Sequence, residues 1–221
     1  AELASLQSYV TVEGGATYYS YGGYFMLGGN IIATGEEAPF SAPSMGSIGS
    51  AASATDAACF HGIFDGQGCT VKGFKFDIGG IFGDIGKGAV IKNVAFEDCN
   101  AAWRNFTANE GEYLRQDGVG VLAANAAGNY LIENVYVELT GNCANGGALV
   151  GRSMKGGTVR NSVVIYNATG GWSMGVLTSW HIESIKLENV YAIMQGKTTM
   201  VTGTDDKKDC PKFVEGSTYT V

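Results

Sequence analysis

One short segment gathers most of the side chains in this sequence that could bind a ligand. It carries aromatic residues and arginines, namely Trp103, Arg104, Phe106, Tyr113 and Arg115. The acids beside them are Glu110, Glu112 and Asp117. Aromatic faces stack on sugar rings, and arginine and carboxylate groups hydrogen-bond to hydroxyls, so this combination predicts a glycan or peptide site. The alternative is that Trp103 and Phe106 only fold the segment onto the rest of the protein.

Residue types suited to catalysis or metal binding are scattered. His61 and His181 lie far apart in the sequence, and neither has a recognisable nucleophile or metal partner. The five cysteines are odd in number and include no Cys-x-x-Cys pair, which predicts neither a zinc site nor a redox motif and leaves one or two disulfides open. The C-terminal acids are interrupted by Lys207 and Lys208, which argues against a calcium loop. We therefore predict no catalytic residue, no metal and no cofactor, and the sequence favours a protein that is not an enzyme.

The composition indicates which elements must position these side chains. The 221 residues include 34 glycines and only 3 prolines, and 16% of residues are charged against 45% that are hydrophobic. Disorder, collagen and a long helical bundle all conflict with this composition, so a β-rich protein with many turns is expected. The net charge of −7 and the absence of long basic runs exclude nucleic acid as the expected partner. No apolar stretch is long enough for membrane insertion, and the initial Ala suggests a processed product or part of a larger polypeptide or assembly.

A repeat is present within the glycine-rich sequence. Four segments read apolar, charged, Asn and then a strand pattern: residues 91–96, 132–137, 159–164 and 187–192. A fifth segment, 71–76, has Gly at the Asn position. Because Asn and Gly most readily adopt left-handed backbone geometry, the shared position predicts a bend between two short strands. The predicted bend residues are Gly73, Asn93, Asn134, Asn161 and Asn189.

A second pattern precedes the four Asn bends at a constant distance. A Gly, x, Ile or Leu, x, small-residue motif places its central apolar residue twelve positions before each Asn, at Ile81, Leu122, Leu149 and Leu177. The bend positions advance by 20, 41, 27 and 28 residues, starting from Gly73. Such periods predict a parallel β-solenoid in which like residues stack about 4.8 Å apart. An antiparallel sandwich is the competing interpretation.

The charged residues just before the bends are expected to form one solvated face of the solenoid. They alternate in kind from one repeat to the next and comprise Lys72, Lys92, Glu133, Arg160 and Glu188. Asp65 is expected to make an Asx-type turn, and His61 to occupy the turn before Gly62. The tyrosines at 18–24 form either a second binding patch or part of a half-buried outer strand.

The repeat resembles a known family. Residues 60–74, FHGIFDGQGCTVKGF, are similar to the opening repeat F-x-G-x-F-D-G-N-G-H-T-I-x-G-L of GLUG-motif bacterial surface proteins. The short glycine motif recurs at 79–83 and 147–151, and 24–32 and 47–49 resemble the family's first coil. Ala124, Ser179 and Cys69 depart from the pattern in turn detail. The resemblance implies right-handed parallel β-helix modules in large secreted or surface-attached bacterial proteins, and it supplies no catalytic residues.

Together these observations predict an all-β, right-handed, single-stranded parallel β-helix (β-solenoid) of about 5–7 coils with terminal caps. A single domain covers residues 1–221. Its N-terminal cap is 1–16, its coils are 17–196 with an insertion at 100–117, and its terminal coil and C-terminal cap are 197–221.

The expected function is that of a non-catalytic module of a bacterial cell-surface or secreted protein. Its task would be adhesion, binding of a glycan or of a host or matrix protein, or structural spacing, in an extracellular or cell-surface location. One alternative is a fibre or spike protein of a phage virion. The other is a polysaccharide lyase or hydrolase, because parallel β-helices host such enzymes.

Overall fold

The computed structural model describes residues 10–13, 16–19, 22–33, 59–76, 80–102, 120–126, 128–142, 145–153, 156–169, 173–181, 185–195 and 218–220. These residues form strands and turns, and none of them lies in a helix. The predicted all-β class is therefore confirmed for the described part of the chain.

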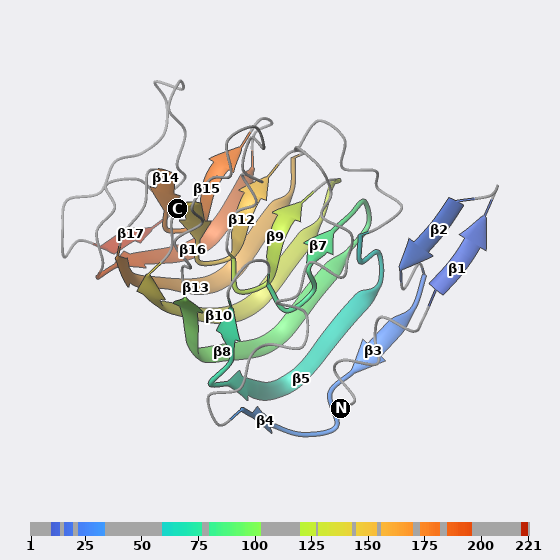
Figure 1. Ribbon diagram of the computed structural model, residues 1–221, viewed down its shortest axis with the longest axis horizontal. Helices are drawn as coiled ribbons and strands as arrows, with labels where there is room; N and C mark the ends of the chain where they lie inside the picture. The colour runs from blue at the N-terminus through green and yellow to red at the C-terminus, as the bar shows by residue number, and fades with distance from the viewer. Residues whose placement is uncertain are drawn as a thin grey trace, which may run out of the picture.

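The largest sheet has nine strands, and most of them are parallel. Its successive members are β3 (Tyr24–Met26), β5 (Ile63–Lys72), β8 (Val90–Ala102), β10 (Leu131–Asn142), β13 (Thr158–Thr169) and β16 (Lys186–Met194). The short strands β4 (Ile31–Ile32) and β6 (Lys75–Phe76) pair with β5 and β8. Figure 1 shows the long strands side by side in chain order, as expected when each repeat adds the next strand.

A second parallel sheet follows the same chain order. It contains β7 (Asp84–Ile85), β9 (Ala123–Ala126), β12 (Val150–Ser153) and β15 (Thr178–His181). β11 (Asn145–Gly147) and β14 (Ser173–Gly175) form a third parallel pair. Two antiparallel pairings occur: β1 (Val10–Glu13) with β2 (Ala16–Tyr19), and β17 (Thr218–Thr220) with the outer edge of β16 (Figure 1).

The register of both large sheets follows the spacing of the sequence repeat. In the nine-stranded sheet Ile132 pairs with Ile91 on one side and with Val159 on the other. In the second sheet Asn125 pairs with Asp84, and Val150 pairs with Ala123 and Thr178. Both sheets therefore advance by the same 41, 27 and 28 residues that separate the Asn bends in the sequence.

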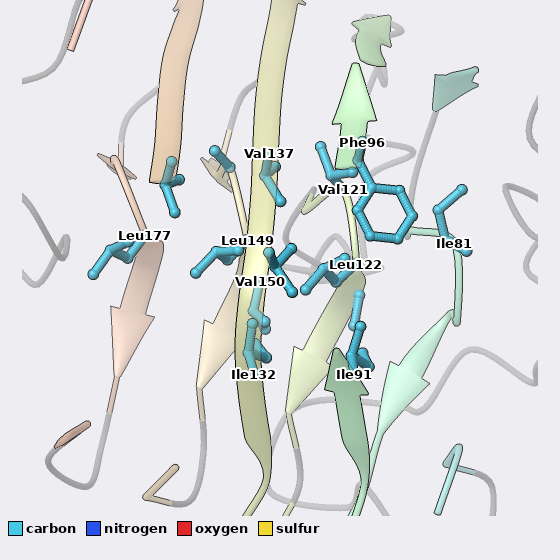
Figure 2. Packing of buried hydrophobic residues seen from close by; sticks show 14 of the residues in the cluster. Ile81, Ile91, Phe96, Val121, Leu122, Ile132, Val137, Leu149, Val150 and Leu177 are labelled. Carbon is cyan, nitrogen blue, oxygen red and sulfur yellow. The ribbon is translucent and has the colours of Figure 1, made fainter. Parts of the chain in front are cut away.

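The core lies between the two large sheets. Figure 2 shows Ile81, Leu122, Leu149 and Leu177 in one row, with Ile91 and Ile132 in a second row beside it. All six side chains are at most 2% exposed. Burying each such side chain contributes about 1.5–3 kcal/mol relative to leaving it in water. Stacked aliphatic rows are thus the main source of stability in this fold.

The four Asn bends and Gly73 have left-handed backbone geometry. Their φ angles are 55° at Asn93, 52° at Asn134, 50° at Asn161, 52° at Asn189 and 79° at Gly73. In an unbent strand, residues three apart face opposite sides of the sheet. Ile91 and Val94 are nevertheless both buried, because the bend between them turns both halves of β8 toward one core.

Asn side chains add hydrogen bonds between neighbouring strands at the bends. Asn134 Nδ2 donates to Asn93 Oδ1 at 3.1 Å, and Asn189 Nδ2 donates to Asn161 Oδ1 at 3.0 Å. Among the described residues no such bond joins Asn134 to Asn161. There Ser162 stands where the other repeats have Val, and its Oγ accepts from the backbone N–H of Val135 at 3.2 Å. Side-chain hydrogen bonds therefore connect the stacked Asn residues in two of the three intervals.

The alignment of Gly73 with the Asn bends is wrong. Val71 pairs with Phe96 rather than with Ile91, and the backbone N–H of Gly73 donates to the carbonyl of Glu97. Gly73 therefore lies level with Asp98, a second left-handed residue of β8 with φ 49°. Opposite Asn93, β5 instead has the three residues 66–68, in which Gln67 has φ 53° and Gly68 has φ 78°. The 20-residue spacing between Gly73 and Asn93 is therefore not the offset at which β5 and β8 pair.

The bend geometry predicts that Asn134→Val destabilises the protein. A β-branched residue in left-handed geometry and the lost Asn93 bond together cost about 2 kcal/mol. Urea unfolding followed by circular dichroism measures this cost. Asn134→Gly is the matched control, because Gly adopts the same φ and loses only the side-chain bond, so its cost should be well below that of Val. Equal costs for both substitutions would contradict the assigned role of the backbone conformation.

Candidate functional site

The predicted ligand-binding residues lie outside the described residues. Trp103, Arg104, Phe106, Tyr113 and Arg115 all fall between Ala102, where β8 ends, and Gly120, where the described chain resumes. The structure therefore describes the chain up to Ala102 and again from Gly120, and the predicted ligand-binding side chains between them lie outside it.

A row of alternating charges crosses five strands of the nine-stranded sheet. We call it the charge row. Its members pair in register across five strands, in the order Asp65, Lys92, Glu133, Arg160 and Glu188. Like charges at directly opposite positions would repel, whereas this alternation makes each neighbour attractive.

Ion pairs run along and beside the charge row. Lys92 Nζ lies 3.3 Å from Asp65 Oδ2, and Arg160 Nε lies 2.9 Å from Glu133 Oε1. At the last strand, Lys186 Nζ lies 2.6 Å from Glu188 Oε1. Every charge of the row therefore has a partner of opposite sign, and for Glu188 that partner is Lys186, beside the row.

The sequence had assigned Lys72 to this row, and that assignment is wrong. Lys72 pairs in register with Glu97, and its Nζ lies 2.8 Å from Asp98 Oδ2. Asp65 occupies the position beside Lys92 that was expected for Lys72. The reason is that β5 and β8 do not pair in the register suggested by the sequence similarity of 71–76 to 91–96.

Asp65 is the most enclosed acid of the charge row, with 4% of its surface exposed. Its Oδ1 accepts from Asn93 Nδ2 and from the backbone N–H of Gln67, both at 3.0 Å. Its Oδ2 accepts from the hydroxyl of Tyr24 at 2.8 Å. The bond to Gln67 confirms the expected Asx-type turn. Asp65 therefore ties β3 and β8 to the turn of β5.

The hydrogen bonds decide the charge state of Asp65. Burial by itself raises the pKa of the carboxyl, but the bonds from Asn93, Gln67, Tyr24 and Lys92 outweigh burial and hold the pKa well below its usual range. The hydrogen bond to Asp65 raises the pKa of Lys92 in turn. Lys92 Nζ also lies 5.7 Å from the centre of the Tyr24 ring, within cation–π range. Both groups are thus held in their charged forms.

A second buried polar pair lies in the other sheet. Asn125 Nδ2 donates to Asp84 Oδ1 at 2.8 Å, and both residues are 5% exposed. Arg152 and Trp180 occupy the next two register positions of the same row. His61 is also buried, and its Nδ1 lies 2.9 Å from the carbonyl oxygen of Lys87, which places it at the turn between β7 and β8. The Asn125 bond joins β9 to β7, and the His61 contact joins the residues just before β5 to the turn between β7 and β8.

The outward side of β10, β13 and β16, beyond the Asn bends, is a surface that the sequence analysis did not identify. Tyr136, Val163 and Tyr191 pair in register there, and Tyr191 is 43% exposed. Two further outward rows lie beside them, Glu138–Ile165–Ile193 and Thr140–Asn167–Gln195. We call these three rows the tyrosine face. Tyr136 and Tyr191 each stand two positions after a bend Asn, which is the signal that could have revealed them.

The described residues contain neither a metal-binding cluster nor a membrane-spanning helix. No three or more His, Cys, Asp or Glu side chains among them lie close enough together to hold a metal ion. Within the same residues, no helix has the length and hydropathy needed to cross a bilayer. Cys69 and Cys99 carry free thiols, and burial raises the pKa of Cys99 to about 12, which makes this thiol unreactive at neutral pH.

Comparisons of the chain with protein-family models, with curated proteins and with solved structures give no match.

The Asp65 contacts predict that the protein loses stability in acid. Because folding lowers the pKa of Asp65, its stabilising contribution is complete above the ordinary Asp pKa of about 3.9 and is lost as the pH falls below it. Asp65→Asn should cost about 2 kcal/mol at pH 7, since it removes the charged acceptor of the hydrogen bonds from Tyr24 and Asn93. The variant should also lose less stability than the wild type between pH 5 and pH 3, as measured by urea unfolding.

Glu138→Gln is the control for this prediction. Glu138 lies on the same sheet and forms no ion pair with any described residue, so its substitution should leave the acid dependence close to that of the wild type. An Asp65→Asn protein that loses as much stability in acid as the wild type would contradict the role assigned to Asp65.

Proposed function

We propose that the protein is a right-handed parallel β-helix module without catalytic activity, which presents binding surfaces on a bacterial cell-surface or secreted protein. The β-helix is supported by the shared register of the two large parallel sheets. Both advance by the same number of residues from one strand to the next, as expected if each repeat is one coil contributing a strand to each sheet. The similarity of residues 60–74 to the GLUG-motif family supports the bacterial surface setting.

One observation carries the non-catalytic function: each charge of the charge row is paired with an opposite charge, either within the row or, for Glu188, on Lys186 beside it. A general acid or base needs a pKa near the working pH. In the charge row the pKa values are shifted away from neutral pH. Hydrogen bonds hold the pKa of Asp65 and of Glu188 below the usual range and raise the pKa of Lys92 and of Arg160. Permanently charged, mutually paired groups stabilise stacked strands and do not exchange protons with a substrate.

The proposed binding role is assigned to the insertion between β8 and β9. Its aromatic and arginine side chains suit a glycan or a host or matrix protein. The insertion follows β8, which ends at Ala102, and precedes β9, which begins at Ala123, and binding residues are commonly found in segments that connect the strands of a rigid scaffold.

A glycan and matrix-protein binding array tests this function. The full chain should bind a limited set of ligands, and Trp103→Ala should weaken that binding at least tenfold, because it removes the largest aromatic surface of the insertion. Met26→Ala is the matched control, since Met26 is 64% exposed on β3 and lies outside the insertion. Binding that is unaffected by Trp103→Ala and Arg104→Ala would remove the insertion from consideration.

Incubation with acidic and neutral polysaccharides tests the non-catalytic part of the proposal. No sustained release of unsaturated or reducing ends is expected. Continuous turnover that increases with protein concentration would contradict the proposal and favour a lyase or hydrolase.

A further inference from the structure

The tyrosine face repeats its chemistry from strand to strand. Tyr136 on β10 and Tyr191 on β16 occupy the same outward row, with Val163 of β13 between them. Neighbouring strands lie about 4.8 Å apart, so the backbones of the two tyrosines are about 10 Å apart. Burial alternates along these strands: Val135, Val137 and Leu139 are buried, while the residues between them are partly exposed. The tyrosine row therefore points away from the core.

Hydrogen-bonding groups run parallel to the tyrosine row. Asn167 and Gln195 are exposed and lie level with each other on neighbouring strands, because the backbone N–H of Gln195 donates to the carbonyl of Tyr166. Their amide groups can both donate and accept hydrogen bonds. A ligand lying across the strands would thus meet an apolar or aromatic row and, beside it, the hydroxyl of Thr140 and the amides of Asn167 and Gln195.

The charges around the tyrosine face disfavour an anionic ligand. Glu138 has no ion-pair partner among the described residues, and Lys72 is already engaged by Asp98 and Glu97. Burial raises the pKa of the Tyr136 hydroxyl, and the charges of Glu138, Glu97 and Asp98 raise it further, as expected in a negative potential. An uncharged ligand with many hydroxyl groups avoids this repulsion.

We propose that the tyrosine face binds an extended, uncharged, β-linked polysaccharide that lies across the strands. One pyranose unit of such a chain is close in length to the spacing between neighbouring strands, so units two apart would stack on Tyr136 and Tyr191. Their hydroxyls would reach the amides of Asn167 and Gln195. A polymer of identical units fits a surface that repeats at a constant spacing, because successive units can make equivalent contacts with successive strands. This site goes beyond the proposed function, because it does not involve the insertion.

Isothermal titration calorimetry on the full chain tests the proposal. The probes are hexamers of β-1,4-linked glucose and of β-1,4-linked N-acetylglucosamine, with an α-1,4-linked glucose hexamer and an oligogalacturonate as comparisons. The wild type should bind at least one β-linked hexamer and should bind neither comparison ligand measurably. Tyr191→Ala should raise the dissociation constant at least tenfold, and Asn167→Ala should raise it several-fold.

Ile32→Ala is the matched control, because Ile32 is 70% exposed on β4 at the far end of the same sheet. Its dissociation constant, and that of Trp103→Ala, should equal the wild-type value. Circular dichroism checks that each variant is folded. If Tyr191→Ala unfolds the protein, Asn167→Ala still tests the proposal, because it changes only an exposed side chain. Failure of both β-linked hexamers to bind would overturn the proposal. So would binding that is abolished by Trp103→Ala and unaffected by Tyr191→Ala, a result that would leave the proposed role of the insertion intact.

Discussion

The described fold depends on one backbone constraint, the left-handed Asn bend that recurs in the long strands β8, β10, β13 and β16. At Asn93, Asn134, Asn161 and Asn189 a positive φ lets residues on both sides of the bend face the same core. Asn tolerates this conformation better than other side chains apart from Gly, and its amide also bonds to the neighbouring strand in two of the three intervals. Without the bend, the residues after it would turn their apolar side chains to solvent, and the core between the two sheets would be lost.

Stacking in register imposes a second condition on the side chains. Each residue lies next to the equivalent residues of the neighbouring repeats. The side chains within one row must therefore be able to pack against one another or attract one another. Apolar rows satisfy this by packing, as Ile81, Leu122, Leu149 and Leu177 do (Figure 2). A charged row satisfies it only by alternation, which the order from Asp65 to Glu188 provides. The same condition explains how the tyrosine face acquires its period, and why the proposed functions concern binding surfaces on a rigid sheet.

The repeat allowed a large part of this structure to be predicted. The four Asn segments and the apolar residues twelve positions before them stack at the offsets that the sequence shows, because a constant spacing in both patterns leaves one register that buries every apolar row. The placement of Gly73 could not be obtained in the same way. Gly is suited to any left-handed position, so the similarity of 71–76 to 91–96 did not identify which bend of β8 it accompanies. Backbone hydrogen bonds to Glu97 identify the second bend.

The sequence by itself determined the β class, the bend positions at the four asparagines and the spacing that aligns successive strands. These depend on local backbone preference and on apolar periodicity, which can be read along the chain. The tertiary structure decided that Asp65 rather than Lys72 begins the charge row, that Tyr24, Asn93 and Lys92 share this carboxylate, and that Tyr136 and Tyr191 stand on one outward row. Each of these facts depends on which residues face each other across strands far apart in sequence. Three residues of β5 opposite one of β8 change that pairing without any visible break in the repeat.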